Sequence, residues 1–141
     1  MTKERSYGVL LKQINDELQK NANNDLRSQG ITATQASALM ELYQVQERQL
    51  SMKDLEERLH VAQSTVVGIV SRLEQKKLVE SSGDPNDKRV KLVKITQAGA
   101  DNVVQAVQHM AQVEQRLLSG LTEAEQSIFY TLLKKVRDTL R

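Results

Sequence analysis

Two cations and two acids stand close together in the stretch "GDPNDKR". The tetrapeptide 84–87 fits a type I turn, with Asp84 at its first position and Pro85 supplying the fixed φ of the second. Lys88 and Arg89 follow at once, so a hairpin here would carry its cations at and just past its tip. Asp87, two residues from Arg89, is in place to orient the guanidinium. We therefore expect a projecting, partly preorganised loop that is longer than the turn itself requires.

Two interpretations of this basic hairpin are open from the stretch alone. In the first, the lysines only keep an edge strand from pairing with another chain. In the second, Arg89 enters beside a narrow, electronegative minor groove of DNA. A helix-turn-helix directly before the hairpin favours the second, because its last helix would then lie in the major groove.

A helix-turn-helix pattern does precede the hairpin. Ser51 is an N-cap candidate for a short helix whose Leu55 and Leu59 face inward. A short turn from His60 leads to the segment 63–77, where one apolar stripe recurs at i, i+3, i+4 and i+7. That stripe is Val66, Ile69, Val70 and Leu73. Two helices, a short turn and a hairpin predict a winged helix-turn-helix over residues 31–96.

The outer face of the second helix carries side chains that can contact DNA. Glutamine pairs with adenine, serine and threonine reach bases or phosphates, valine contacts a thymine methyl group, and arginine binds guanine or phosphate. A merely solvated face is the alternative, against which an exposed Val67 argues. The predicted DNA-binding residues are Gln63, Ser64, Thr65, Val67, Gly68, Ser71, Arg72, Lys88 and Arg89.

Amphipathic helices flank this region. Apolar positions from residue 11 onward predict a first helix up to about Leu26, with Gly30 as the break after it, and Thr32 with Gln35 forms a capping box for a second helix. The inward face of that second helix would be Ala36, Leu39, Met40 and Tyr43.

Beyond the hairpin, Thr96 can cap a long helix that Gly120 interrupts, and Thr122 with Glu125 caps a last one. The stripe of the long helix is Ala100, Val103, Val104, Val107, Met110, Ala111, Leu117 and Leu118, and that of the last is Ile128, Leu132, Leu133, Val136 and Leu140.

The first helix and the last two lie outside the winged region, each with an apolar stripe to bury. Together they can form a helical layer that a two-fold partner completes. We predict a mainly α (α+β) single domain over residues 1–141, with 31–96 as the DNA-binding lobe and 1–30 and 97–141 as a helical dimerisation region. Two recognition helices in successive major grooves then require half-sites roughly 34 Å apart on a pseudopalindromic duplex.

Composition narrows the class of protein further. The chain has 141 residues, a net charge of +2 and no cysteine, which excludes disulfides and thiol redox sensing. The longest apolar run, residues 66–70, is far short of the roughly 20 that a membrane span needs, and the N-terminus lacks the apolar core of a signal peptide. The cytoplasm is therefore the expected compartment. Three tyrosines and one phenylalanine are too few for stacking single-stranded bases.

Nothing in the sequence favours an enzyme. Ser64 and Ser71 have no histidine base nearby, and no glycine-rich phosphate loop or paired-carboxylate motif is present. His60 and His109 are the only histidines, which makes a poor zinc site in a chain without cysteine. A small metal-dependent enzyme is the weakest reading, and we expect neither metal nor cofactor.

The segments ITATQ, SRLEQKKLVE, DPNDKR and KIT, in this order before a long helix, resemble the MarR (multiple antibiotic resistance regulator) family. The resemblance covers nearly the whole chain, and Asp87-x-Arg89 is its most specific element. It implies a dimeric winged-helix transcription regulator, often a repressor released by small ligands. It also implies an effector site in the crevice between the helical layer and the DNA-binding lobes, whose residues the sequence does not identify.

Two positions depart from the family pattern. Gly68 stands where members often carry a larger polar or basic residue, and tolerated drift explains it better than a close approach to DNA. Lys77 stands where many have a glycine, which puts the left-handed cap at this helix end in doubt. The rival function is a winged-helix protein–protein module without DNA binding. The basic cluster 88–94 favours DNA over that module.

Overall fold

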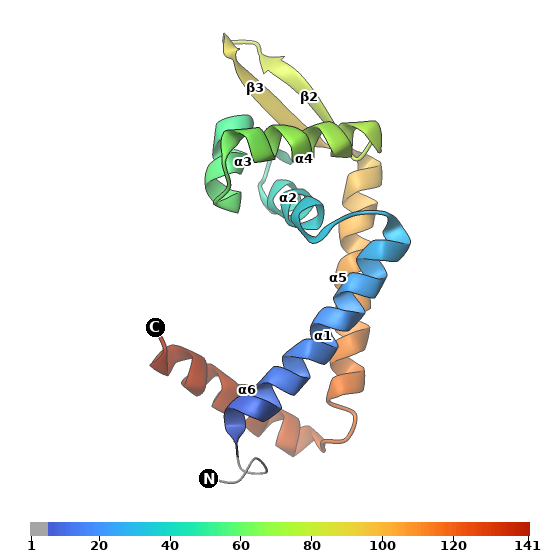
Figure 1. Ribbon diagram of the computed structural model, residues 1–141, viewed down its shortest axis with the longest axis vertical. Coiled ribbons are helices and arrows are strands. Elements are labelled where there is room, and N and C mark those ends of the chain that lie inside the picture. The colour runs from blue at the N-terminus through green and yellow to red at the C-terminus, as the bar shows by residue number, and fades with distance from the viewer. Residues whose placement is uncertain (1–5) are drawn as a thin grey trace. The chain divides into compact units, whose positions relative to one another are not determined.

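The computed structural model describes residues 6–141, which form six helices and a three-stranded antiparallel sheet of order β1-β3-β2 (Figure 1). This confirms a mainly α winged helix-turn-helix. The described chain divides into two compact units, one that runs to Gln108 and one from His109 to Arg141. The elements are α1 (Tyr7–Gln29), α2 (Ala33–Gln44), β1 (Gln49–Ser51), α3 (Met52–Leu59), α4 (Gln63–Gln75), β2 (Val79–Asp84), β3 (Asp87–Ile95), α5 (Gln97–Leu117) and α6 (Glu123–Thr139).

The helix ends follow the predicted capping residues. Thr32 and Thr122 each form a complete capping box. The Ser51 hydroxyl accepts a hydrogen bond from the Asp54 amide, which begins α3. Gly30 ends α1 in the left-handed region at φ 72°. These caps satisfy backbone donors and acceptors that a helix end otherwise leaves unpaired, at about 1 kcal/mol for each side-chain cap.

The core of the first unit lies between α2, α3, α4 and the sheet. The predicted α4 stripe is buried throughout. The largest fully buried side chains are Leu39, Leu42, Leu55, Leu73, Val66, Val70, Val79 and Val93. Full burial of one such side chain contributes roughly 1.5–3 kcal/mol, so α4 is held firmly by its inner face.

The predicted inward face of α2 was wrong by about one residue. Only Leu39 of that set is fully buried, and Ala36, Met40 and Tyr43 are half-buried at the edge of the core. The buried residues of α2 are Gln35, Ala38, Leu39 and Leu42. The buried face includes a polar residue, Gln35, which a search for apolar periodicity does not count as buried. The Gln35 amide oxygen accepts hydrogen bonds from the Thr32 amide and from Lys76, which makes its burial tolerable.

The hairpin between β2 and β3 corrects the expectation of a long loop. Only Pro85 and Asn86 connect the strands, because Asp84 pairs directly with Asp87. The next pair is Gly83 with Lys91, so β3 has three residues, 88–90, between two pairs that are adjacent in β2. Lys88 and Arg89 therefore lie in an irregular part of a strand and not in a loop.

The second unit contains the end of α5 and all of α6. None of the residues of α6 is buried. Its predicted apolar stripe lies on the surface of this single chain, with Ile128 59% and Leu132 52% exposed. Across residues 6–141, no helix combines the length and apolarity needed to cross a membrane.

Candidate nucleic-acid interface

The outer face of α4 is open to solvent. All seven predicted α4 residues are exposed: Gln63, Ser64, Thr65, Val67, Gly68, Ser71 and Arg72. Val67 is 50% exposed although it is apolar. A Cβ atom added at Gly68 would meet nothing within 4 Å beyond its own part of the helix, so no packing contact in the chain explains the glycine. The exposure leaves this face available to a partner, and its contact with DNA stays a prediction.

A groove of about 570 Å³ lies between the beginning of α3, the beginning of α4 and the irregular part of β3. Gln63 and Val67 of α4 and Arg89 of β3 line it together, which brings the predicted helix face and hairpin arginine to one place. The complete lining is Ser51, Met52, Lys53, Glu56, Gln63, Val66, Val67, Arg89, Val90 and Lys91. The other predicted residues, Ser64, Thr65, Gly68, Ser71, Arg72 and Lys88, are exposed outside this lining.

The groove also contains residues that the sequence did not single out. Lys53 lies in the first turn of α3 and adds a cation to the lining of the groove. Glu56, one helical turn later, adds an anion. No local spacing links Lys53 to α4 or to Arg89, because only the packing of α3 brings it to this groove. Lys91 belongs to the recognised basic cluster and contributes a third cation.

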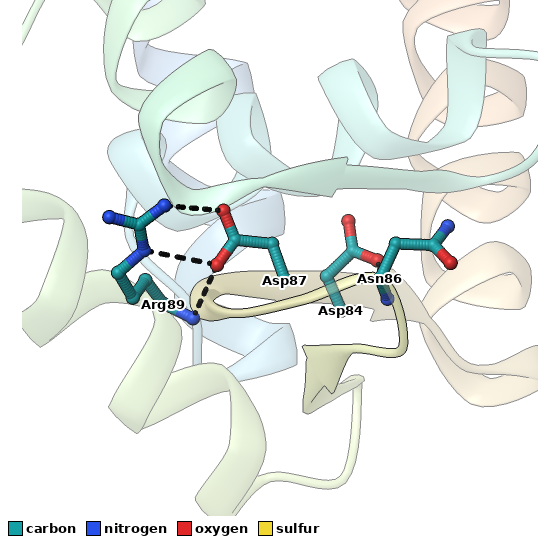
Figure 2. Close-up of polar contacts among 4 residues, drawn as sticks. All are labelled: Asp84, Asn86, Asp87 and Arg89. Carbon is teal, nitrogen blue, oxygen red and sulfur yellow. Dashed lines mark hydrogen bonds and ion pairs between the residues drawn. The ribbon is translucent and has the colours of Figure 1, made fainter.

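The Asp87–Arg89 pair is formed as predicted (Figure 2). The Asp87 Oδ1 accepts hydrogen bonds from the Arg89 amide at 3.1 Å and from its Nε at 3.2 Å, and Oδ2 accepts from Nη2 at 3.4 Å. The side-chain hydrogen bond from Arg89, followed by that from its amide, lowers the pKa of Asp87 from its ordinary 3.8. The guanidinium is thus oriented by a carboxylate that stays ionised, while the Arg89 side chain remains 91% exposed.

The turn before this pair is held by its own aspartate. The Asp84 Oδ1 accepts a hydrogen bond from the Asn86 amide at 2.8 Å. This contact spans Pro85 and fixes the two-residue connection. The position of Arg89 therefore depends on two short-range carboxylate contacts, both within the hairpin.

The described residues contain no group of three or more histidine and acidic side chains arranged to hold a metal ion. His60 is exposed and serves as the left-handed C-cap of α3, with φ 54°. Its backbone amide closes the end of the helix, which is a structural role.

Comparisons with known proteins agree with this geometry. The MarR family model matches residues 29–90. The multiple antibiotic resistance protein MarR of Salmonella typhimurium is 32% identical over 130 residues, covering 92% of this chain and 89% of MarR. The transcriptional repressor NicR of Pseudomonas putida is 32% identical over 89 residues, which is 63% of this chain. The chain spans about half the length of some relatives that it matches, including 56% of NicR.

The solved structures point to the same group. MepR, a transcription regulator of a Staphylococcus aureus multidrug efflux pump, superposes with a TM-score of 0.87 at 29% identity, covering 96% of this chain and 99% of MepR. MepR in complex with DNA gives a TM-score of 0.81 at 30% identity, covering 96% of this chain and 100% of the other. MepR bound to ethidium bromide gives 0.73 at 29% identity, covering 99% and 100%.

Proposed function

The chain belongs to the MarR family of transcription regulators, and we propose that it acts in the cytoplasm as a homodimeric repressor of a pseudopalindromic operator. The observation that carries the proposal is the groove shared by the first turn of α4 and by Arg89. A duplex that receives α4 in its major groove then meets an arginine already oriented by Asp87. Structures of MepR include a DNA complex, which supports this use of the fold.

The charges of the groove fit a polyanion. Lys53, Arg89 and Lys91 line it against one anion, Glu56. Cations of this kind neutralise phosphates and release bound counterions, which makes affinity depend on salt. Gln63 and Val67 line the same protein groove. They supply an amide and an apolar contact for base edges in the major groove of the DNA. In this proposal the cations set the position of the duplex, and α4 reads its sequence.

The homodimer and the ligand response are parts of the same proposal. The uncovered apolar stripe of α6 supports self-association through residues 1–30 and 97–141, with residues 31–96 as the DNA-binding lobe. The ethidium-bound form of MepR supports a small-molecule effector. Without cysteine, that response must arise from ligand binding and not from thiol oxidation.

The decisive experiment is selection of bound duplexes from random DNA by the purified full chain. We expect enrichment of inverted half-sites roughly 34 Å apart, with an affinity that falls steeply as salt rises. Lys20→Ala, which removes an exposed cation of α1, is the matched control for variants of the groove. Failure to enrich any duplex, or a flat salt dependence, would favour the rival protein–protein module.

The effector response is tested on the selected operator. Peroxide should leave binding intact over minutes, because rapid oxidation needs a thiolate. A panel of small aromatic and anionic molecules should contain at least one that weakens binding. Fast loss of binding under peroxide that a thiol reductant reverses would contradict this mechanism, whereas slow methionine oxidation would not.

A further inference from the structure

The segment between α4 and β2, residues 76–78, is where several distant elements meet; we call it the α4–β2 turn. Its three amides close α4 with backbone hydrogen bonds. The Lys76 amide donates to the Arg72 carbonyl at 3.2 Å, the Lys77 amide to that of Glu74 at 2.9 Å, and the Leu78 amide to that of Leu73 at 3.0 Å. Lys77 adopts φ 62°, the left-handed conformation that this closure requires. The last turn of α4 therefore ends in a defined geometry.

The beginning of α5 is attached to the α4–β2 turn. The Thr96 hydroxyl donates to the Lys77 carbonyl at 2.8 Å, and the Thr96 amide donates to the Leu78 carbonyl at 3.0 Å. A Cβ atom at Gly99 would overlap the Leu78 carbonyl oxygen, so only glycine permits this close approach. Thr96 is also the residue whose hydroxyl caps the first turn of α5, through the Gly99 amide.

The end of α1 is attached to the same turn through one side chain. The Lys76 ammonium donates to the carbonyl oxygen of Gly30 and, at 3.1 Å, to Oε1 of Gln35. Gly30 is the left-handed cap of α1, and Gln35 is a buried polar residue of the core, 3% exposed. Lys76 thus spans more than forty residues of sequence to join the end of α4 to the junction of α1 and α2.

The chemistry of this contact suits an ammonium group. Carbonyl groups at a helix C-terminus carry the negative end of the helix dipole and lack partners within the helix. The three donors of a lysine can satisfy the Gly30 carbonyl and the buried Gln35 oxygen together. Without Lys76, the Gln35 oxygen would keep only its longer hydrogen bond from the Thr32 amide, at 3.3 Å.

We propose that Lys76 is a positioning residue for operator recognition, which fixes the recognition helix against the end of α1 and so limits the half-site spacing that the dimer accepts. This inference rests on the proposed function, in which α1 and α5 belong to the dimerisation region. In a dimer, the distance between the two copies of α4 is then set by the dimerisation region, provided that each α4 is rigidly attached to that region. Thr96 and Gly99 provide one joint, and Lys76 provides the other.

The test measures affinity for a series of duplexes made from the selected operator, in which one or two base pairs are added or removed between the half-sites. The proteins are the full-length wild type, Lys76→Met, Lys76→Arg and Lys77→Met. Lys76→Met keeps the stem and removes the donors. Lys77→Met removes the neighbouring charge and is the matched control. Thermal unfolding of each variant shows that it is folded.

We expect the wild type to lose affinity sharply at altered spacings. In Lys76→Met that penalty should shrink by about threefold to tenfold, as expected when one contact in a coupling network is removed. Lys76→Arg should restore the wild-type profile, because a guanidinium also donates to both acceptors. Lys77→Met should keep the wild-type dependence on half-site spacing, with its affinity changed by the same factor at every spacing.

Three results would overturn the inference. These are an unchanged spacing profile in Lys76→Met, a uniform loss at every spacing, and equal effects of Lys76→Met and Lys77→Met, which would assign the lysine to charge alone. A wild type that binds no duplex, or binds every spacing equally, would instead contradict the proposed function. The two failures are therefore distinguishable.

Discussion

The winged helix-turn-helix region and α6 both carry an apolar stripe, but the stripe is buried in the winged region and exposed on α6. Leu55 and Leu73 in the winged region are fully buried within a single chain, whereas Leu132 and Val136 of α6 are 52% and 53% exposed. Both stripes have helical periodicity in the sequence. The winged region therefore completes its own core, and α6 leaves its apolar side chains for another surface to cover.

The helix α5 contains both behaviours. Val103 is 3% exposed beside the winged core, while Val104 and Val107, on the same helix, are 40% and 51% exposed. Helical periodicity shows that a stripe exists but not what covers it. The stability of the winged region should therefore be independent of protein concentration, whereas burial of the α6 stripe should depend on a second copy of the chain.

The largest expected effect follows from removing residues 122–141, which deletes α6. We expect this truncation to abolish dimerisation, because no residue of α6 is buried in the described part of the chain. The winged region should remain folded, since its core lies in the first unit. Sedimentation velocity of the full chain and the truncated chain measures the first effect, and circular dichroism measures the second.

A truncated chain that still sediments as a stable dimer would contradict this prediction and would move the interface to the other flanking helices. A truncated chain that unfolds would show that the winged region is not independent.

One leucine from each region should show the same difference when it is replaced by alanine. Leu73→Ala removes a fully buried side chain and should cost about 2–5 kcal/mol of unfolding free energy at every protein concentration. Leu132→Ala should act mainly by weakening the dimer, so its effect on stability should vary with protein concentration. Urea unfolding at several protein concentrations measures both. Equal concentration dependence in the two variants would refute the distinction.

The hairpin should affect DNA binding without affecting either region's stability. Arg89→Ala should weaken binding to most sequences by roughly 1–3 kcal/mol and flatten the salt slope by about one unit per subunit. Asp87→Ala should cause a smaller version of this defect. Arg72→Ala, on the outer face of α4, should instead alter sequence preference if Arg72 contacts a base. Titration against operator and random duplexes at several salt concentrations distinguishes these outcomes.

The lowered pKa of Asp87 adds a condition to this prediction. A carboxyl group whose pKa is lowered by folding loses its contribution only as the pH falls through that lowered value. The hold on Arg89 should therefore be constant from about pH 8 to about pH 5. If the wild type lost DNA affinity between about pH 8 and about pH 5, and Asp87→Ala did not show this pH dependence, the ionised pair would be contradicted.

The Arg89→Ala prediction has its own contradicting outcome. If this variant leaves affinity and salt slope unchanged, the hairpin has no role at the minor groove.

The sequence predicted well those features that depend on neighbouring residues. Thr32 with Gln35 and Thr122 with Glu125 form their capping boxes, and the stripe of α4 is buried as its spacing indicates. The Asp87–Arg89 pair also needs only local geometry. Features that depend on distant residues were missed. The groove partner Lys53 comes from another helix.

Dependence on distant residues also explains the two wrong predictions, the inward face of α2 and the long hairpin loop. Gln35 lies at the centre of the α2 face because Lys76, far along the chain, satisfies its amide oxygen. The short hairpin connection reflects the pairing register of two strands, which the stretch of turn-forming residues around Pro85 concealed. Composition and spacing do not specify such pairings, because they arise only when the whole first unit is packed.

The smallest predicted effect concerns two helix ends that use the left-handed conformation. The sequence put the cap at Lys77 in doubt, yet the structure forms it there at φ 62°, as it does at Gly30 at φ 72°. Non-glycine residues adopt this conformation at a cost of roughly 1 kcal/mol. Lys77→Gly should therefore stabilise the chain by about 1 kcal/mol, less the entropy that glycine adds to the unfolded state.

Gly30→Ala is the matched opposite, because nothing lies within 4 Å of its added Cβ and only the backbone conformation is at issue. It should destabilise the chain by a similar amount of roughly 1 kcal/mol. Urea unfolding at one fixed protein concentration measures both variants. If Lys77→Gly were destabilising, the lysine stem would be contributing packing beside Glu74 and Glu80, which line the same small surface hollow. The stability of the winged region would then depend on an exposed side chain at the turn where α4 ends, in addition to its buried core.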